Sequence, residues 1–302
     1  MPPTTPARTD RLRTLADTVY VASRCKVVYV QVFKAACSTM LWTLLELEGH
    51  DPSVLDASLR ADIPTHELLV HDRSLYPIPV ITEVGAELRH EALTSDAWLR
   101  VAVTRNPYAR LYSAWESKLL LGDPGPWQAM GGPPPVFIDG DLDVGESFRA
   151  FVADFAARPE IWMTEPHFAT QSSLLALEEI DYDELVPTSR LGALIDTLSV
   201  RAGVHVTPPR ANQGLGIDWA GLLDERSASS IASLYAADFE ALGYEPMAGG
   251  DPVEVRLGPV AQRLRIAAIE RSERTLELGA ASQEALAAVP ADEGRRRGRW
   301  RS

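Results

Sequence analysis

Cysteine, long apolar runs and excess positive charge are all scarce in this chain of 302 residues. Its two cysteines, Cys25 and Cys37, provide no disulfide framework, so we expect a reducing compartment. The chain lacks the run of about 18 apolar residues that a membrane helix requires, and its start, MPPTTPARTD, has no apolar signal-peptide core. A soluble, cytoplasmic protein without a membrane partner is therefore expected.

The formal net charge of −13 excludes a generally basic surface. Nucleic acids and anionic membranes both favour basic partners, so neither is expected to bind this protein. Any bound anion must then be held by local positive charge. With 46% hydrophobic residues the chain can bury an ample core, and its length favours one main domain with appendages.

Composition divides the chain into three parts. Residues 1–18 are expected to be a flexible tail, and residues 19–246 the main domain. Residues 247–302 are rich in Ala, Glu and Arg and end in the basic tail RRRGRWRS. Their charge pattern predicts a helical extension that is either solvated or self-associating, which makes a homodimer through this extension one expectation.

Glycine is missing from the most informative stretch of the chain. A buried strand is predicted at residues 26–32 (KVVYVQV) and a helix at residues 38–48, with the turn KAACST at residues 34–39 between them. The Walker pattern GxxxxGK[ST] is absent, because no glycine occurs between Val27 and Glu48. A strand that leads through small residues into a helix still directs backbone amides at an anion, and Lys34 adds a full charge.

A second strand-to-helix unit follows at residues 98–121. The strand WLRVAVT (98–104) ends before Arg105, and Pro107 marks the start of an amphipathic helix that carries Ser113. If the two strands are parallel neighbours, Lys34 and Arg105 meet at the sheet edge where α/β folds bind ligands. Either residue alone is better explained by a surface ion pair. Their matching positions at strand ends favour one split anion site.

The rest of the main domain has weaker signals. Gly- and Pro-rich residues 122–145 predict a long surface loop, and residues 206–216 a second irregular segment. Periodicity predicts a short strand at residues 184–187 and helices at residues 146–157, 190–202 and 224–242. The alternation of strands and helices indicates an α/β fold.

The two units also carry a family resemblance. Residues 34–39 resemble the 5′-phosphosulfate loop, and RNPYARLYSAW (105–115) resembles the 3′-phosphate motif, of sulfotransferases that use 3′-phosphoadenosine 5′-phosphosulfate. EPHFATQ (165–171), followed by IDY (180–182), and LYAADFEALGY (234–244) resemble segments of the carbohydrate sulfotransferase branch. Over residues 26–244 the resemblance implies a P-loop NTPase-like fold, with a central parallel sheet flanked by helices. The chain departs from the family at Phe33, where proline is usual, and in lacking the membrane anchor of Golgi members.

The resemblance implies a role for each motif residue. The 5′-phosphosulfate would be held by Lys34, Ala35, Ala36, Cys37, Ser38 and Thr39, with Lys34 also stabilising the departing phosphate. Arg105 and Ser113 would bind the 3′-phosphate, which distinguishes this co-substrate from ATP. The acceptor would be a hydroxyl of a carbohydrate or glycosylated small molecule, and no metal is required by in-line sulfuryl transfer.

The acceptor hydroxyl needs a base, and several candidates stay open. His167 is the first, although a purely structural role explains it almost as well, and Glu165 is the second. His66 and His71 lie between the two motifs, where a related heparan branch places its base. Arg210 and Asn212 occupy a loop that could reach the nucleotide, although an ordinary surface loop explains them too.

Two other functions remain as alternatives. One is a divergent nucleotide kinase, against which the missing Walker pattern counts. Kinases also use acidic Mg²⁺ ligands, whereas the second strand ends in Thr104 and Arg105. The other is a catalytically silent nucleotide-binding scaffold protein that assembles through its C-terminal extension.

Overall fold

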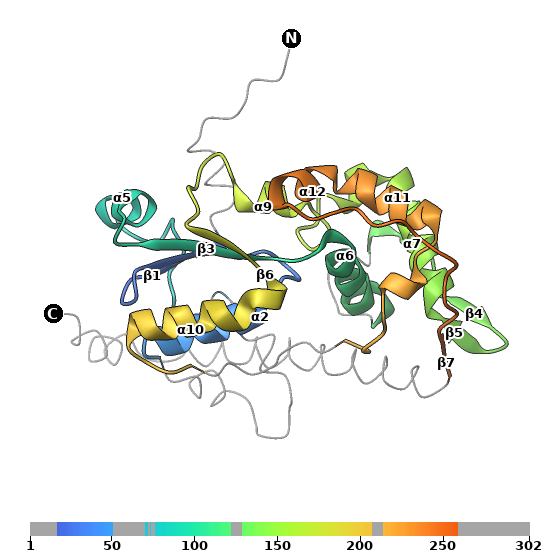
Figure 1. Cartoon of the computed structure of the whole chain (residues 1–302), viewed down its shortest axis with the longest axis horizontal. Coiled ribbons are helices and arrows are strands. Elements are labelled where there is room, and N and C mark those ends of the chain that lie inside the picture. Colours follow the sequence, from blue (N-terminus) through green and yellow to red (C-terminus); the bar gives the residue numbers. More distant parts are fainter. Residues whose placement is uncertain are drawn as a thin grey trace, which may run out of the picture.

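The computed structural model describes residues 17–50, 70–71, 73, 76–121, 129–206 and 214–258. The candidates His66, Arg210 and Asn212 lie outside these residues, as does the stretch 259–302. Within the described part, the chain folds around a four-stranded sheet with the order β1-β2-β3-β6 (Figure 1). Its strands are β1 (Val19–Ala22), β2 (Val27–Val30), β3 (Leu99–Thr104) and β6 (Glu184–Pro187).

The central sheet is mixed, so the expectation of a purely parallel sheet is wrong in part. Strands β2, β3 and β6 are parallel, but β1 is antiparallel to β2, with Val19 opposite Val30. Only residues 23–26 join β1 to β2, which is too short for the crossover that a parallel pair requires. The three parallel strands are the ones that position the site, because their carboxyl ends share one edge.

Helices cover both faces of this sheet, as Figure 1 shows for α2 and α10 on one face and α5 on the other. Side chains alternate between the two faces along each strand. Val27 and Tyr29 pack with α2 and α10 on one face, whereas Val28 and Val30 pack on the other face, in the hydrophobic cluster that includes residues of α5 and α9. The helices on the two faces are α2 (Cys37–Leu47), α5 (Ala86–Thr94), α9 (Gln171–Leu175) and α10 (Leu191–Ala202), with the 3₁₀ turn η3 (Thr188–Arg190) before α10.

A second group of helices packs beside the sheet around its own aromatic-rich core. It contains α6 (Pro107–Trp115), α7 (Val144–Ala157), α11 (Glu225–Leu234) and α12 (Ala236–Leu242), with the short helices α8 (Pro159–Trp162) and η4 (Ala220–Leu222). The helix predicted at residues 108–121 is confirmed, but its last part, η1 (Glu116–Leu120), is a π-helix. Asn106 caps α6 by accepting from the amides of Tyr108 and Ala109 at 3.0 and 3.4 Å.

Two secondary-structure predictions are wrong in this part of the chain. The predicted loop 122–145 contains a hairpin, β4 (Val136–Ile138) and β5 (Asp141–Asp143), whose turn residues Asp139 and Gly140 both have positive φ. The predicted helix 224–242 is broken at Tyr235 into α11 and α12. Tyr235 is buried, and its hydroxyl donates to the Phe168 carbonyl at 2.6 Å, which fixes the break against the preceding segment.

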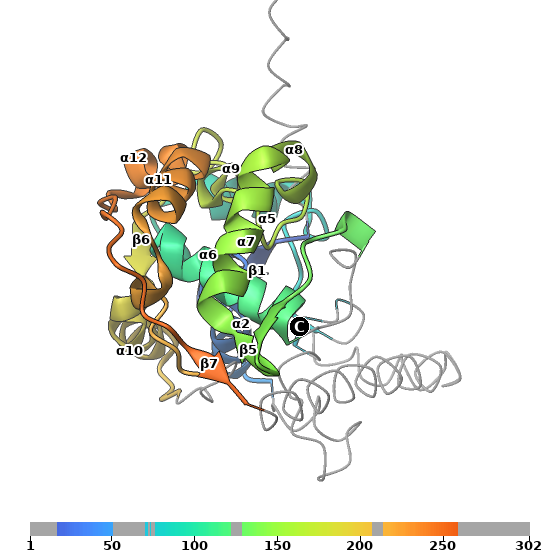
Figure 2. The ribbon, with the colours of Figure 1, turned by 90° about the vertical axis from the view of Figure 1, so that its right-hand side faces the viewer.

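The expected C-terminal helix does not begin at residue 247. Residues 247–258 contain no helix, and β7 (Arg256–Leu257) instead pairs with β5 to give a small sheet of order β4-β5-β7 (Figure 2). Self-association through residues 247–302 stays a prediction, as does the division into three parts. In contrast, the predictions of β6 and α10 are confirmed within a residue, and α10 ends at Gly203 with a φ of +69°.

Candidate functional site

The turn between β2 and α2 has an unusual backbone. Lys34 and Ala36 have φ values of +64° and +59°, in the left-handed region that glycine usually occupies. Each such residue costs about 1–2 kcal/mol and persists only where its surroundings hold it there. Ala36 is the N-cap of α2 and provides no side-chain cap. The N-cap side chain therefore does not compete for the first amides of α2, and such alternating backbone forms an anion-binding concavity.

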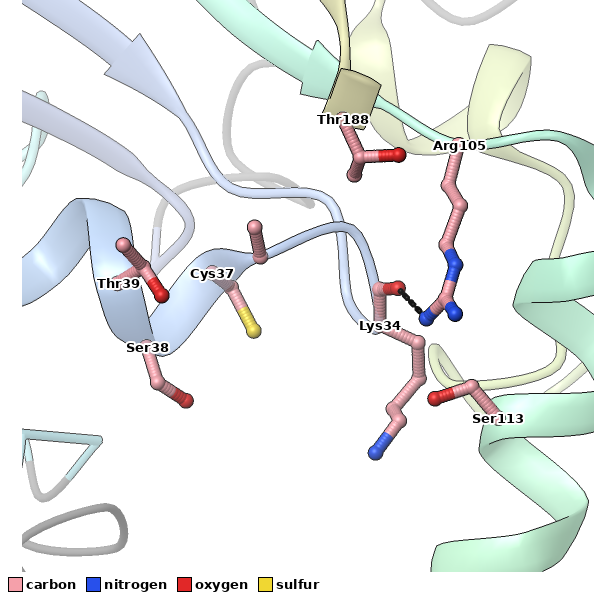
Figure 3. A pocket seen from close by; sticks show the side chains of 8 residues that line it. Lys34, Cys37, Ser38, Thr39, Arg105, Ser113 and Thr188 are labelled. Atoms are coloured by element: carbon pink, nitrogen blue, oxygen red, sulfur yellow. Dashed lines mark hydrogen bonds between the residues drawn. The ribbon is translucent and has the colours of Figure 1, made fainter. Parts of the chain in front are cut away.

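The turn opens on a cavity of about 230 Å³. Its lining comprises Lys34, Ala36, Cys37, Ser38, Thr39, Arg105, Ser113 and Thr188. Figure 3 shows the Lys34 side chain between Arg105 and Ser113 on one side and the start of α2 on the other. The lining holds two cations and four hydroxyls, and no carboxylate occurs among these residues. This combination of cations and hydrogen-bond donors fits an anion with two charged groups.

The cavity brings together the two predicted units. All the residues predicted to bind the donor line it except Ala35, which is buried beneath the turn. Thr188 was not predicted, although it directly follows β6, the third strand that ends at this edge. A sequence signal for Thr188 existed, since β6 itself was expected at residues 184–187.

The main chain of Arg105 is held in place by the side chain of Gln171. The Arg105 N–H donates to Gln171 Oε1 at 2.8 Å, and Gln171 Nε2 donates back to the Arg105 carbonyl at 2.7 Å. The Arg105 guanidinium donates to the Lys34 carbonyl at 3.1 Å, the dashed line in Figure 3. Burial lowers the pKa of Arg105, and the nearby Glu116 carboxylate opposes this shift. A cation that has lost hydration in this way is stabilised by a bound anion.

Arg110 joins the turn at residues 34–39, called the donor loop from here on, to the segment 165–171. Its side chain is fully buried and donates to the carbonyls of Phe33, Ala169 and Pro166 at 2.8, 2.6 and 3.0 Å. Burial lowers its pKa, and Tyr235 and Asp238 oppose the shift. Arg110 therefore stabilises the site from behind and does not line the cavity. From the sequence, Arg110 was recognised only as part of the motif at residues 105–115 and was given no role.

Asp238 connects the last motif to the site. Its buried carboxylate accepts from the amides of Gln171 and Ser172, both at 2.8 Å, at the start of α9. Nearby, the hydroxyls of Thr104 and Tyr244 lie 3.0 Å apart. The segments 165–171 and 234–244 thus meet behind Arg105. Neither Gln171 nor Asp238 was predicted as a site residue, and the only signal was that both belong to the motifs of the resemblance.

His167 and Glu165 form a pair beside the donor loop. His167 Nδ1 lies 2.6 Å from Glu165 Oε1, and the His167 ring packs 4.7 Å from that of Phe33. Burial, together with Lys118 and Lys34, lowers the pKa of His167 to about 4, although Glu165 opposes this. Burial raises the pKa of Glu165, but the hydrogen bond from His167 outweighs it, and the net shift is downward. The pair does not line the cavity itself.

The other histidine candidate with a described position is His71. Its Nε2 lies 2.8 Å from Ser38 Oγ and 4.0 Å from Cys37 Sγ, and its Nδ1 lies 3.4 Å from Gln31 Nε2. Burial raises the pKa of the Cys37 thiol, but His71 and Lys34 outweigh this and lower it to about 6. His71 therefore touches the donor loop directly, whereas His167 does not touch Ser38 or Cys37 in any described contact.

No group of three or more His, Cys, Asp or Glu side chains is arranged to hold a metal ion in the described part of the chain. None of its helices has the length and apolar character needed to cross a bilayer.

Fold and site together define an α/β protein with a cavity lined by cations and hydroxyls at the carboxyl edge of its parallel strands. Residues 17–245 match the family model described as "Sulfotransferase family". This match covers most of the chain, so the protein belongs to the sulfotransferase family, which confirms the resemblance at that level. Members are transferases that move a sulfuryl group to a hydroxyl-bearing acceptor, and they generally use 3′-phosphoadenosine 5′-phosphosulfate. No curated protein and no solved structure gave a significant match.

Proposed function

We propose that this protein transfers a sulfuryl group from 3′-phosphoadenosine 5′-phosphosulfate to a hydroxyl of a carbohydrate or glycosylated small molecule. The observation that carries the proposal is that Lys34 and Arg105 line the same cavity, together with hydroxyl side chains. The carbohydrate acceptor rests on the resemblance of residues 165–171 and 234–244 to the carbohydrate branch. We expect acceptor specificity to lie in residues 49–97 and 122–145.

At the loop end, Lys34 and the amides of residues 35–39 would hold the 5′-phosphosulfate. When the bond from sulfur to the bridging phosphate oxygen breaks, negative charge grows on that oxygen. Lys34 lies at the start of the loop and would stabilise this charge, together with the positive end of the α2 dipole. The hydroxyls of Ser38 and Thr39, which line the same cavity, would add hydrogen bonds.

At the other end, Arg105 and Ser113 would bind the 3′-phosphate. The Arg105 guanidinium is already fixed by its bond to the Lys34 carbonyl, and its main chain is fixed by Gln171. Arg105 can therefore bind a phosphate with little further loss of side-chain entropy. This end gives the selectivity against ATP, which has no 3′-phosphate.

His167 is the first candidate for the base, on the resemblance of its segment to the family, and Glu165 is the second. The lowered pKa of Glu165 keeps it ionised at neutral pH, so its carboxylate accepts and His167 Nδ1 carries the hydrogen. Nε2 is then the nitrogen with a lone pair. Proton transfer from the acceptor hydroxyl to Nε2 would form an imidazolium that the Glu165 carboxylate stabilises.

The proposal is tested with purified protein, labelled donor and a mixture of candidate acceptors. We expect mass spectrometry to find an added sulfate, and Lys34→Ala to abolish its transfer. Arg105→Ala should weaken binding of 3′-phosphoadenosine 5′-phosphate by roughly ten- to a hundredfold in calorimetry, since a charge-assisted contact is worth about 1.5–3 kcal/mol. Arg226→Ala, at an exposed position of α11, is the control and should bind normally.

Each alternative predicts a different outcome. A wild-type protein that fails to bind 3′-phosphoadenosine 5′-phosphate, or an Arg105→Ala variant with unchanged affinity, would contradict the proposal. Mg²⁺-dependent ATP turnover that survives Arg105→Ala would support a kinase. Binding without transfer to any acceptor of a broad panel would support a silent nucleotide-binding scaffold.

A further inference from the structure

His71 contacts the donor loop but has no part in the mechanism above. It lies between two side chains that come from either end of that loop, Gln31 just after β2 and Ser38 in the first turn of α2. Gln31 is itself fixed, because only 3% of its surface is exposed and its backbone N–H donates to the Thr18 carbonyl at 2.8 Å. The imidazole thus bridges the two sides of the loop.

The order of hydrogens along this bridge follows from the chemistry of its members. With the Gln31 amide oriented as in the structure, its Nε2 donates and His71 Nδ1 accepts, across 3.4 Å. In the neutral ring Nε2 then carries the hydrogen and donates to Ser38 Oγ, across 2.8 Å. A serine oxygen that accepts from the histidine directs its own hydrogen elsewhere. Ser38 lines the cavity, so an anion bound there can accept this hydrogen.

We propose that His71 is a positioning residue, which orients the Ser38 hydroxyl toward the sulfuryl-bearing phosphate, and that it is not the base of the reaction. The role in turnover rests on the proposed function. Both ring nitrogens are engaged, Nδ1 as an acceptor from Gln31 and Nε2 as a donor to Ser38, which at 2.8 Å is much nearer than Cys37 Sγ at 4.0 Å, so neither is available to take the proton of an acceptor hydroxyl. A hydroxyl rotor fixed before the reaction stabilises developing charge without reorganising when the charge appears.

Two substitutions of His71 separate positioning from base catalysis. His71→Ala removes the donor to Ser38, whereas His71→Gln keeps an amide N–H at a similar reach but has no proton-accepting nitrogen. Removing one such oxyanion donor altogether costs about 10²–10³ in kcat, and a misdirected hydroxyl should cost part of this, roughly tenfold. We expect His71→Ala to lower kcat to that extent, with binding of 3′-phosphoadenosine 5′-phosphate within about twofold of wild type, and His71→Gln to restore most of the rate.

A double-mutant cycle tests whether His71 acts through Ser38. If it does, Ser38→Ala/His71→Ala is no slower than Ser38→Ala alone. His90→Ala, at an exposed position of α5, is the matched control and should retain full activity. Thermal unfolding of each variant identifies a loss of rate that comes from misfolding. Additive losses in the cycle, or a His71→Gln variant as slow as His71→Ala, would overturn the proposal and return His71 to the candidates for the base.

The tautomer provides a readout that does not depend on activity. Nitrogen-15 NMR of the imidazoles in the wild-type protein should show His71 protonated at Nε2 and not at Nδ1. An Nδ1–H tautomer would overturn the proposed hydrogen-bond order even in an active enzyme. Conversely, an Nε2–H tautomer in a protein that transfers no sulfate would support the hydrogen-bond order and contradict the proposed function instead.

Discussion

Gln171 should decide how firmly Arg105 is held at its end of the cavity. Its side-chain amide pairs with both main-chain groups of Arg105, at 2.8 and 2.7 Å, much as a neighbouring strand would. Gln171 is fully buried, so water cannot replace these bonds. Substituting Gln171→Leu keeps the approximate volume but leaves one donor and one acceptor unpaired. At about 1–3 kcal/mol for each group, the expected loss of folding free energy is about 2–6 kcal/mol.

Stability is measured by urea unfolding monitored through tryptophan fluorescence, and binding of 3′-phosphoadenosine 5′-phosphate is measured by calorimetry. We expect the loss of stability to be accompanied by weaker binding, because the Arg105 side chain then extends from a main chain that is no longer fixed. Ser173→Ala, on the exposed side of the same short helix, is the control and should change stability by less than about 0.5 kcal/mol.

A second substitution makes the test more specific. Gln171→Glu keeps the acceptor for the Arg105 N–H but removes the donor to its carbonyl. It also places a second carboxyl near Asp238, whose Oδ2 lies 3.5 Å from Gln171 Nε2. Like charges in a buried site favour protonation of one group, so this variant should regain stability as the pH falls. If both variants unfold like wild type and bind the nucleotide with unchanged affinity, Gln171 does not hold Arg105 and the reasoning is refuted.

Three further substitutions test the surroundings of the site. Ala36→Gly should leave stability unchanged or raise it by up to about 1 kcal/mol, because glycine adopts the left-handed conformation without a steric penalty. The control Ala153→Gly, within α7, should lower stability by about 1 kcal/mol. Equal losses of the two variants in thermal unfolding would contradict this. Arg110→Met should cost at least about 3 kcal/mol, as three carbonyls lose their donor, whereas Arg226→Met should cost almost nothing. His167→Asn should make the free energy of unfolding less sensitive to acid. The pKa of His167 is about 4 in the native protein and about 6.5 in the unfolded chain, so between these pH values only the unfolded chain binds the proton. The wild-type protein therefore loses up to about 1.4 kcal/mol of stability per pH unit as the pH falls, and the variant should not. Identical pH slopes of the two proteins in urea unfolding at pH 5 and 7 would count against that role.

Local patterns were enough to predict the parts of the fold that carry the cavity. The apolar runs before Lys34 and Arg105, and Pro107 at the start of a helix, each act over a few residues, and the strands and helices they predict are present. Their convergence followed from one further assumption, that the two strands are parallel neighbours. The register between β2 and β3 confirms it.

The errors arose where a local signal was weak or was overlooked. The four residues of β1 are too few to distinguish a strand by pattern, and their antiparallel pairing depends on a short turn. The hairpin at residues 136–143 had a clear signal, since Asp139-Gly140 is a preferred hairpin turn, but the surrounding Gly and Pro residues favoured a loop. The break at Tyr235 could not be predicted, because it depends on a contact with Phe168, 67 residues away.

The missing glycines of the donor loop have a structural consequence that joins the two ends of the site. Lys34 and Ala36 adopt conformations that L-residues avoid, so contacts from outside the turn must hold them. Two such contacts come from the 105–115 motif: Arg105 donates to the Lys34 carbonyl and Arg110 to the Phe33 carbonyl. The motif that we propose binds the 3′-phosphate therefore also shapes the loop that we propose binds the 5′-phosphosulfate. Because the two arginines support the strained turn, a change at Arg105 should disturb Lys34 as well, and the free-energy effects of substitutions at these two residues should not add.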